Sequence, residues 1–184
     1  MAYILAKKYG STQIWKENRV VPVTIVEALP NTVSLVRTKA RDGYQAIQLQ
    51  LGKRAKREFR VPGEPGKAIG DKLTVAVFNS GDHVKVSGIS KGRGFQGVVK
   101  RHGFHGGPKT HGQKDRLRAP GSIGSTAPQR VVPGRKMPGQ MGNVRVTVSN
   151  LEVVSVDTEK NQIFLKGAVP GAKGGLLEIR SAKS

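Results

Sequence analysis

The sequence predicts an all-β fold, either a closed barrel or a sandwich, interrupted by one long basic segment. Short runs rich in Val, Ile and Thr recur along the chain and are broken by Gly, Pro, Asn and Asp, which is typical of many short strands. The 24 Gly and 10 Pro among 184 residues, together with the lack of any long stretch with a 3.6-residue apolar period, argue against a helical bundle. Residues 91–143 differ in composition and separate an earlier series of strands from a later one.

The expected strands follow from these apolar runs and the residues that interrupt them. Before the basic segment we expect strands near residues 3–6, 12–15, 19–28, 32–38, 44–51, 57–61, 72–78 and 83–89. After it we expect strands near 144–149, 151–157, 162–166 and 176–180. Apolar and polar residues nearly alternate within 46–51, as on a half-buried strand, and 157–161 predict a hairpin loop. The two series are expected to complete one β-barrel body made of residues 1–90 and 144–184.

The basic segment lacks the side chains needed for a core. Residues 91–143 contain 11 Lys or Arg, a single acid (Asp115), 12 of the 24 Gly and only eight large aliphatic or Met side chains. Burying so few side chains does not offset the conformational entropy of ordering the segment, which costs about 1–2 kcal/mol per residue for the backbone alone. We therefore predict an extended basic arm, inserted in the barrel, that needs a partner to hold its shape.

The charge of the chain indicates what that partner is. With 32 Lys and Arg against 12 Asp and Glu, the net charge is +20, which favours a polyanion such as nucleic acid. RNA is expected rather than DNA because the sequence offers no recognition helix for a major groove, and irregular arms suit folded RNA. The predicted RNA-binding residues are Lys91, Arg93, Lys100, Arg101, His102, Lys109, His111, Lys114, Arg116, Arg118, Arg130, Arg135, Lys136 and Gln140. Close backbone approach to the RNA is expected at Gly121, Gly124, Gly139 and Gly142.

Two competing interpretations of the basic segment stay open. One is a disordered basic loop with a nonspecific role, and the other is a basic protein that compacts DNA. Comparable affinity for duplex DNA and for folded RNA at physiological salt would favour the second. Met137, Gln140 and Met141, near the second limb of the arm, are expected to pack against unstacked bases.

A glycine motif raises the alternative of a nucleotide-binding enzyme. Residues 92–97 match G-x-G-x-x-G, and Asp115 follows about 20 residues on, as in a dinucleotide-binding fingerprint. That fold requires a helix after the third glycine, and at 98–103 we expect no apolar helix that could pack on a sheet. Nucleotide binding measured by calorimetry would discriminate between the two functions. Without the helix the motif predicts no cofactor, and we expect a protein that is not an enzyme.

Other candidates for chemistry are weak. His102, His105 and His111 lie close together in the sequence, but the surrounding Lys and Arg repel a divalent ion, so contact with phosphates or bases is expected in place of a metal site. The chain has no Cys, which excludes disulfides, thiolate metal ligands and Cys nucleophiles. It begins without the pattern of a signal peptide and has no apolar run of membrane-spanning length, so a cytoplasmic protein is expected.

Several long motifs resemble the bacterial form of the large-subunit ribosomal protein L3 family. The similar segments, which run in order along nearly the whole chain, are 7–10, 42–48, 90–101, 111–112, 118–124, 136–143 and 166–171. The resemblance implies a structural constituent of the large ribosomal subunit, with a six-stranded Greek-key barrel of the translation-protein type and a long internal loop. It further implies binding to 23S-type rRNA near its 3′ end, an early role in subunit assembly, and a loop that reaches toward the peptidyl-transferase centre.

The resemblance also implies partners and one modification. The expected neighbours are the large-subunit proteins numbered fourteen and nineteen, with no membrane, no small-molecule substrate and no cofactor beyond Mg²⁺ held by the RNA. Gln140 matches a glutamine that some family members methylate. The chain departs from the family in a shorter region around 52–70, and in Trp15, which stands where Phe is common and where we expect a core position.

Overall fold

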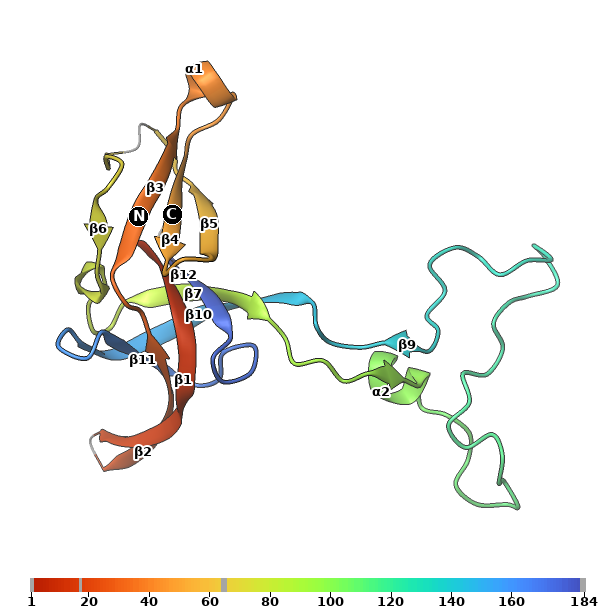
Figure 1. Ribbon diagram of the computed structural model, residues 1–184. Coiled ribbons are helices and arrows are strands. Elements are labelled where there is room, and N and C mark those ends of the chain that lie inside the picture. Colours follow the sequence, from red (N-terminus) through yellow and green to blue (C-terminus); the bar gives the residue numbers. More distant parts are fainter. Residues whose placement is uncertain (1, 17, 64–65, 183–184) are drawn as a thin grey trace. The chain divides into compact units, whose positions relative to one another are not determined.

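The computed structural model describes residues 2–16, 18–63 and 66–182. It divides into two compact units (Figure 1). The first, which we call the body, comprises Met1–Ser90 and Arg145–Ser184. The second, which we call the arm, comprises Lys91–Val144 and thus ends one residue beyond the predicted basic segment. Within the described residues, no helix is long and apolar enough to cross a membrane.

Six strands of the body form a sheet that closes on itself. They are β1 (Tyr3–Lys16), β2 (Arg19–Glu27), β7 (His83–Ile89), β10 (Arg145–Asp157), β11 (Gln162–Lys166) and β12 (Leu176–Ser181). Around the ring the order is β1-β12-β7-β10-β11-β2, and every neighbouring pair is antiparallel. The prediction of a mostly β protein is therefore confirmed. The segments predicted at 83–89 and 162–166 match β7 and β11 residue for residue.

Two strands are longer than predicted because each absorbs an irregularity. β1 shifts its register against β2 between Lys8 and Gly10, and β10 shifts against β7 between Val148 and Leu151. Asn150, inside β10, has a φ of 60°. A bulge of this kind bends a strand without ending it. The Gly and Asn residues that predicted breaks near residues 7–11 and at residue 150 therefore lie inside single strands.

The other four strands of the body lie outside the closed sheet, so the expectation that all of the predicted strands complete one barrel is wrong. They are β3 (Asn31–Arg37), β4 (Ala46–Leu51), β5 (Ala55–Arg60) and β6 (Lys72–Leu73), and they form a separate sheet in the order β5-β4-β3-β6. The one-turn helix α1 (Lys39–Asp42) connects β3 to β4 and ends at Gly43, whose φ is 78°. The strand expected at 72–78 stops at Leu73, because a 3₁₀ turn over Val75–Val77 turns Val75 into the core.

β1 supplies side chains to both cores of the body. Successive side chains of a strand point to opposite faces. Ile4 and Ala6 accordingly lie in the cluster inside the closed sheet, whereas Tyr3 and Leu5 lie in the cluster beneath the second sheet. Tyr3 stacks on Phe59 of β5 with ring centroids 5.1 Å apart, and burial raises the pKa of the Tyr3 phenol. The start of β1 thus joins the two sheets.

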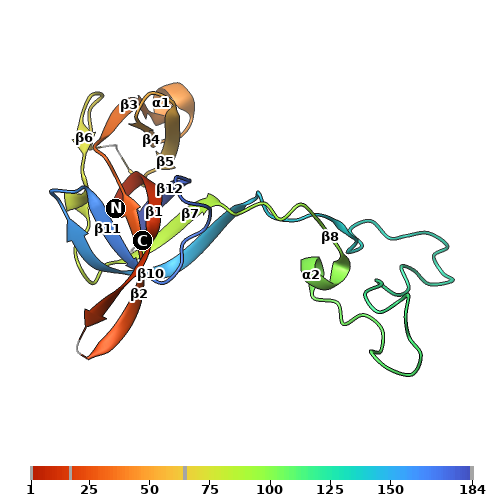
Figure 2. The same cartoon turned by 60° about the horizontal axis from the view of Figure 1, so that its bottom comes forward.

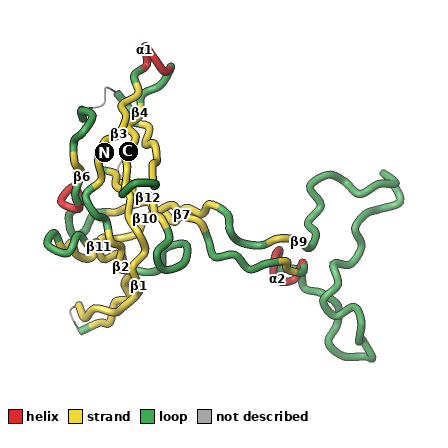
Figure 3. The backbone as a smooth tube through the Cα atoms, in the orientation of Figure 1, coloured by secondary structure: helices red, strands yellow, loops and turns green. Residues whose placement is uncertain are grey.

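The arm has little regular structure (Figure 3). Its only elements are a two-stranded ladder of β8 (Phe95–Gln96) with β9 (Gly139–Gln140) and the short helix α2 (Val98–His102). The Arg93 amide donates to the Met141 carbonyl at 2.9 Å, and the Met141 amide donates to the Gly94 carbonyl at 3.0 Å. The two limbs of the arm are therefore paired where they begin and end, and the chain between α2 and β9 is irregular.

Candidate nucleic-acid interface

The cations of the arm are presented to solvent. Every predicted RNA-binding side chain is exposed except Arg101 and His102, which are half-buried. Across all 54 arm residues, every one of them described, Val98 is the only one that is buried. Phe95 is 75% exposed and Val132 is 55% exposed, although both are apolar. The arm therefore exposes positive charge and apolar surface together. Such a surface is typical of a site that a binding partner covers.

The arm and the body differ in their ion pairs. The ion pairs among the described residues all join body residues, and none involves a cation of the arm. The arm's one acid, Asp115, is exposed and takes part in none of these pairs. Because eleven positive charges face one negative charge, the arm attracts anions along its whole length.

Several charged side chains of the body are paired with one another. Arg37 donates to Glu58 at 2.8 Å and to Asp42 at 2.6 Å. The bond from Arg37 lowers the pKa of the Glu58 carboxyl, and the same bond raises the pKa of Arg37. Lys166 donates to Glu152 at 2.9 Å and lowers the pKa of that carboxyl. These acids and bases stabilise one another and form no site for chemistry.

Two predicted RNA contacts have a second role inside the arm. Arg101 Nη1 donates to the Met137 carbonyl oxygen at 2.6 Å, and His102 Nε2 lies 3.1 Å from the same oxygen. Both side chains come from α2, whose N-terminal Gly97 follows β8 directly. They therefore attach the helix to the opposite limb, and the half-buried state of both side chains reflects this contact.

A further cross-link lies farther along the arm. A terminal guanidinium nitrogen of Arg135 donates to the Ser122 carbonyl, joining residues thirteen apart in the chain. Arginine has five N–H donors, so this single bond leaves most of the guanidinium free for a phosphate. Arg135 can thus shape the arm and contact RNA at once.

The four glycines predicted to approach RNA fall into two pairs. A Cβ at Gly142, whose φ is +76°, would lie 2.1 Å from the Lys91 carbonyl oxygen, and a Cβ at Gly139 would lie 3.0 Å from the guanidinium of Arg101. These two glycines allow close approach within the arm itself. Gly121 faces open space, and a Cβ at Gly124 would meet only a carbonyl oxygen at 3.7 Å, so these two positions stay accessible to a ligand.

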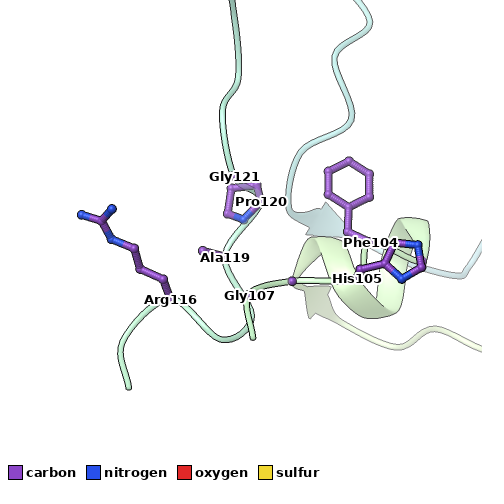
Figure 4. Close-up of a pocket in the computed structure, with 9 residues that line it drawn as sticks. Phe104, His105, Gly107, Arg116, Ala119, Pro120 and Gly121 are labelled. Carbon is purple, nitrogen blue, oxygen red and sulfur yellow. The ribbon is translucent and has the colours of Figure 1, made fainter. Parts of the chain in front are cut away.

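One cavity of the arm was missed by sequence reasoning. It has a volume of about 510 Å³, and Figure 4 shows it lying between Phe104 and His105 on one stretch of chain and Ala119 and Pro120 on another, with Arg116 beside them. Of these residues, Arg116 was a predicted RNA-binding residue, and His105 was expected to contact phosphates or bases. The available signal was the presence of an aromatic residue next to a histidine in a segment with few aromatics.

Among the described residues, neither the glycine motif nor the three histidines of the arm form the site that nucleotide binding or metal binding would need. A short helix, α2, begins at Val98 after the third glycine, and its last three residues are Lys100, Arg101 and His102. This helix is one turn long, and the described strands pair only antiparallel, so the motif lacks the parallel sheet of a dinucleotide fold. Within the described chain, no three His, Asp or Glu side chains meet in a group suited to a metal ion.

Comparisons with known proteins show which family the chain resembles. The family model described as ribosomal protein L3 matches residues 5–163. The large ribosomal subunit protein uL3 of Herpetosiphon aurantiacus is 48% identical over 205 aligned positions, which cover 98% of this chain and 97% of the relative. The corresponding proteins of Roseiflexus sp. and Fervidobacterium nodosum are 49% and 43% identical, with at least 96% of each chain covered. Because 205 positions exceed the 184 residues of this chain, the first relative carries residues that this chain lacks.

The chain combines a β-sheet body with a cationic arm that buries a single side chain. This combination is typical of structural proteins of ribonucleoprotein particles, in which RNA covers the arm and neutralises its charge. Within that class, the length and identity of the matches fix the family. The chain belongs to the ribosomal protein L3 family, in its bacterial form, and is a non-enzymatic protein of the large ribosomal subunit.

Proposed function

We propose that this protein is a structural constituent of the large subunit of the cytoplasmic ribosome, and that the arm is its principal RNA-binding element. The observation that carries the proposal is the arm's surface, where eleven cations lack ionic partners among the described residues. Phosphate groups of a 23S-type rRNA supply those partners, and Arg binds them with paired hydrogen bonds. Mg²⁺ enters only as part of the folded RNA.

The arm is proposed to thread between RNA helices in an extended form. Its limbs are paired at β8 and β9 and joined again by Arg101 and Arg135, so the backbone path is defined while most cations point outward. The apolar side chains that it exposes, Phe95 among them, suit contact with unstacked bases. Gln140 lies in β9, where its backbone pairs with Phe95 and its side chain is exposed.

The finer assignments rest on the family. We propose that the chain binds near the 3′ end of the rRNA, joins the subunit early in assembly, and sends the arm toward the peptidyl-transferase centre. The proteins numbered fourteen and nineteen are its proposed neighbours. The closed six-stranded sheet supports a Greek-key barrel of the translation-protein type. The exposed side chain of Gln140 supports its methylation, and mass spectrometry of the native protein would reveal the added methyl group.

The test is a pair of measurements on the full chain. Native protein should co-sediment with large subunits through a sucrose gradient, and purified protein should bind folded large-subunit rRNA in a filter assay. A variant with Gln at Lys109, Lys114, Arg116 and Arg118 should bind far more weakly, while a variant with Gln at four exposed body lysines (Lys39, Lys53, Lys56 and Lys67) should lose less. Equal losses would show that net charge, and not the arm, carries binding. Equal affinity for duplex DNA would overturn the choice of RNA.

A further inference from the structure

The end of the β1–β2 hairpin exposes the only Trp of the chain. Trp15 is 72% exposed, and Val20, directly opposite on β2, is 44% exposed. The expectation that Trp15 occupies a core position is therefore wrong. In Figures 1 and 2 the hairpin continues away from the rest of the closed sheet, and the exposed pair lies in this protruding part. A large indole left in water at a strand pair is costly unless a partner covers it.

The protruding part of the hairpin lies beyond the strands that pair with its base. β12 pairs with β1 only at Tyr3–Lys7, and β11 pairs with β2 only at Val23–Glu27. Beyond those pairs, the described residues of the hairpin form a two-stranded ribbon with register from Gln13 opposite Pro22 to Lys16 opposite Arg19. An isolated two-stranded ribbon is marginally stable in water. A binding partner at its end would stabilise it.

The charges at the end of the hairpin indicate the kind of partner. Lys16 and Arg19 face each other one position beyond the Trp15–Val20 pair and are both exposed. Lys16 has one distant ion pair, 3.9 Å from Glu152, and none of the described residues forms an ion pair with Arg19. Because side chains alternate along a strand, Lys16 and Arg19 lie on the face opposite Trp15, so the end of the ribbon carries an exposed aromatic ring on one face and cations on the other. Single-stranded nucleic acid is bound by such groups, in which a ring stacks on a base and cations contact phosphates.

We propose that the β1–β2 hairpin is a second RNA-binding element, in which Trp15 stacks on an unpaired base of the large-subunit rRNA and Arg19 binds a neighbouring phosphate. This inference rests on the proposed function and adds a contact outside the arm. RNA is favoured over a protein partner because the body itself carries half of the net charge of +20, and the register pair next to Trp15 and Val20 consists of the two cations Lys16 and Arg19.

Because Trp15 is the only Trp, its fluorescence reports on this contact alone. We expect the free full-length protein to show the emission of a solvated indole when it is excited where Tyr does not absorb. Addition of folded large-subunit rRNA, with no other protein present, should quench the emission strongly, since an excited indole transfers an electron to a base stacked on it. Quenching by the RNA supports the proposal.

Failure of the inference is distinguishable from failure of the proposed function. If the rRNA binds in the filter assay while the emission stays that of a solvated indole, the hairpin does not contact RNA and the inference is overturned. A blue shift that appears only in whole subunits overturns it as well, because a protein neighbour then covers Trp15. If the rRNA does not bind at all, the proposed function fails first.

Variants give an independent measurement. Trp15→Ala should weaken rRNA binding roughly tenfold, as expected for one lost base stack, and Trp15→Phe should recover most of that loss. The matched control is Ile69→Ala, which removes an apolar side chain that is 66% exposed on the body and should leave affinity unchanged. Equal affinities for Trp15→Ala and the control would overturn the proposal. Thermal unfolding of each variant checks that the body still folds.

Discussion

Gly142 shows how a single residue shapes the arm. Its φ of +76° is one that side-chain-bearing residues rarely adopt, and its Cα lies so close to the other limb that a Cβ would meet the Lys91 carbonyl oxygen at 2.1 Å. The obstruction is backbone, which cannot rotate away as the end of a side chain can. The pairing of Arg93 with Met141 depends on this approach.

We therefore expect Gly142→Ala to force the limbs apart and to weaken rRNA binding by at least tenfold, as measured by filter binding. Gly97→Ala is the control within the arm, because a Cβ there meets nothing within 4 Å and the φ of −69° suits any residue. Similar affinities of the two variants would contradict the internal role assigned to Gly142.

Two arginines of the arm are expected to behave differently. Arg116 is exposed, whereas Arg101 is half-buried and donates to Met137. Arg116→Gln should weaken rRNA binding and reduce the slope of log affinity against log salt by about 1, because one phosphate contact is lost. Arg101→Gln should weaken binding with a smaller change in slope, since part of its effect is to loosen the arm. Titrations at several salt concentrations separate the two, and equal slope changes would refute the distinction.

At the scale of elements, the second sheet depends on a charged network around Glu58. Arg37, Tyr44 and Gln48 all donate to this carboxylate from β3, from the loop after α1 and from β4. The bond from Arg37 lowers the pKa of Glu58 in the folded state. A carboxyl group with a lowered folded pKa contributes stability above its unfolded pKa, and that contribution is lost as the pH falls through the folded value.

We expect the thermal midpoint of the free protein to fall on acidification below about pH 4.5, the ordinary value for Glu. Glu58→Gln should lower the midpoint at neutral pH and should flatten this acid dependence. Glu159→Gln is the control, because Glu159 is exposed in the β10–β11 turn and forms none of the ion pairs among the described residues. Parallel pH curves for the wild type and Glu58→Gln would contradict the role of the network.

The arm, as an element, is expected to depend on its host. With Val98 as its one buried side chain, it gains too little burial energy to stay folded in water. Trypsin should cleave the free protein rapidly after Lys109, Lys114 and Arg118, and the same bonds should resist cleavage in the large subunit. Mass spectrometry of timed digests gives both rates. Equal protection in the two states would mean that the arm folds by itself.

At the scale of the whole molecule, affinity should be governed by charge. A protein with a net charge of +20 releases many counterions when it binds RNA. The logarithm of affinity should fall linearly with the logarithm of salt concentration, with a slope of about −0.7 to −0.9 for each phosphate contacted. If most arm cations bind phosphates, affinity falls by several orders of magnitude between low and physiological salt. A flat dependence would contradict the proposed interface.

Sequence reasoning located strands well and assigned them to sheets poorly. The alternating run 46–51 predicted β4 correctly because the pattern of a strand is local. Membership in the second sheet depends on pairing with β3 and β5 and on the insertion of Tyr3 and Leu5 from a distant strand. Among the predicted site residues, exposure was foreseen for the free cations, whereas the attachment of Arg101 to Met137 was not. Those two residues lie 36 positions apart.

The sequence by itself determined that the protein is built of strands, that its middle segment is polycationic and lacks a core, and that it belongs with the ribosomal L3 proteins. All three follow from composition and from contiguous motifs. Only the tertiary structure decided that the ten described strands of the body divide between two sheets, that Gly139 and Gly142 face their own chain, and that Trp15 lies in water. These features depend on contacts between residues far apart in the chain, and local patterns carry no information about which distant partner a residue meets.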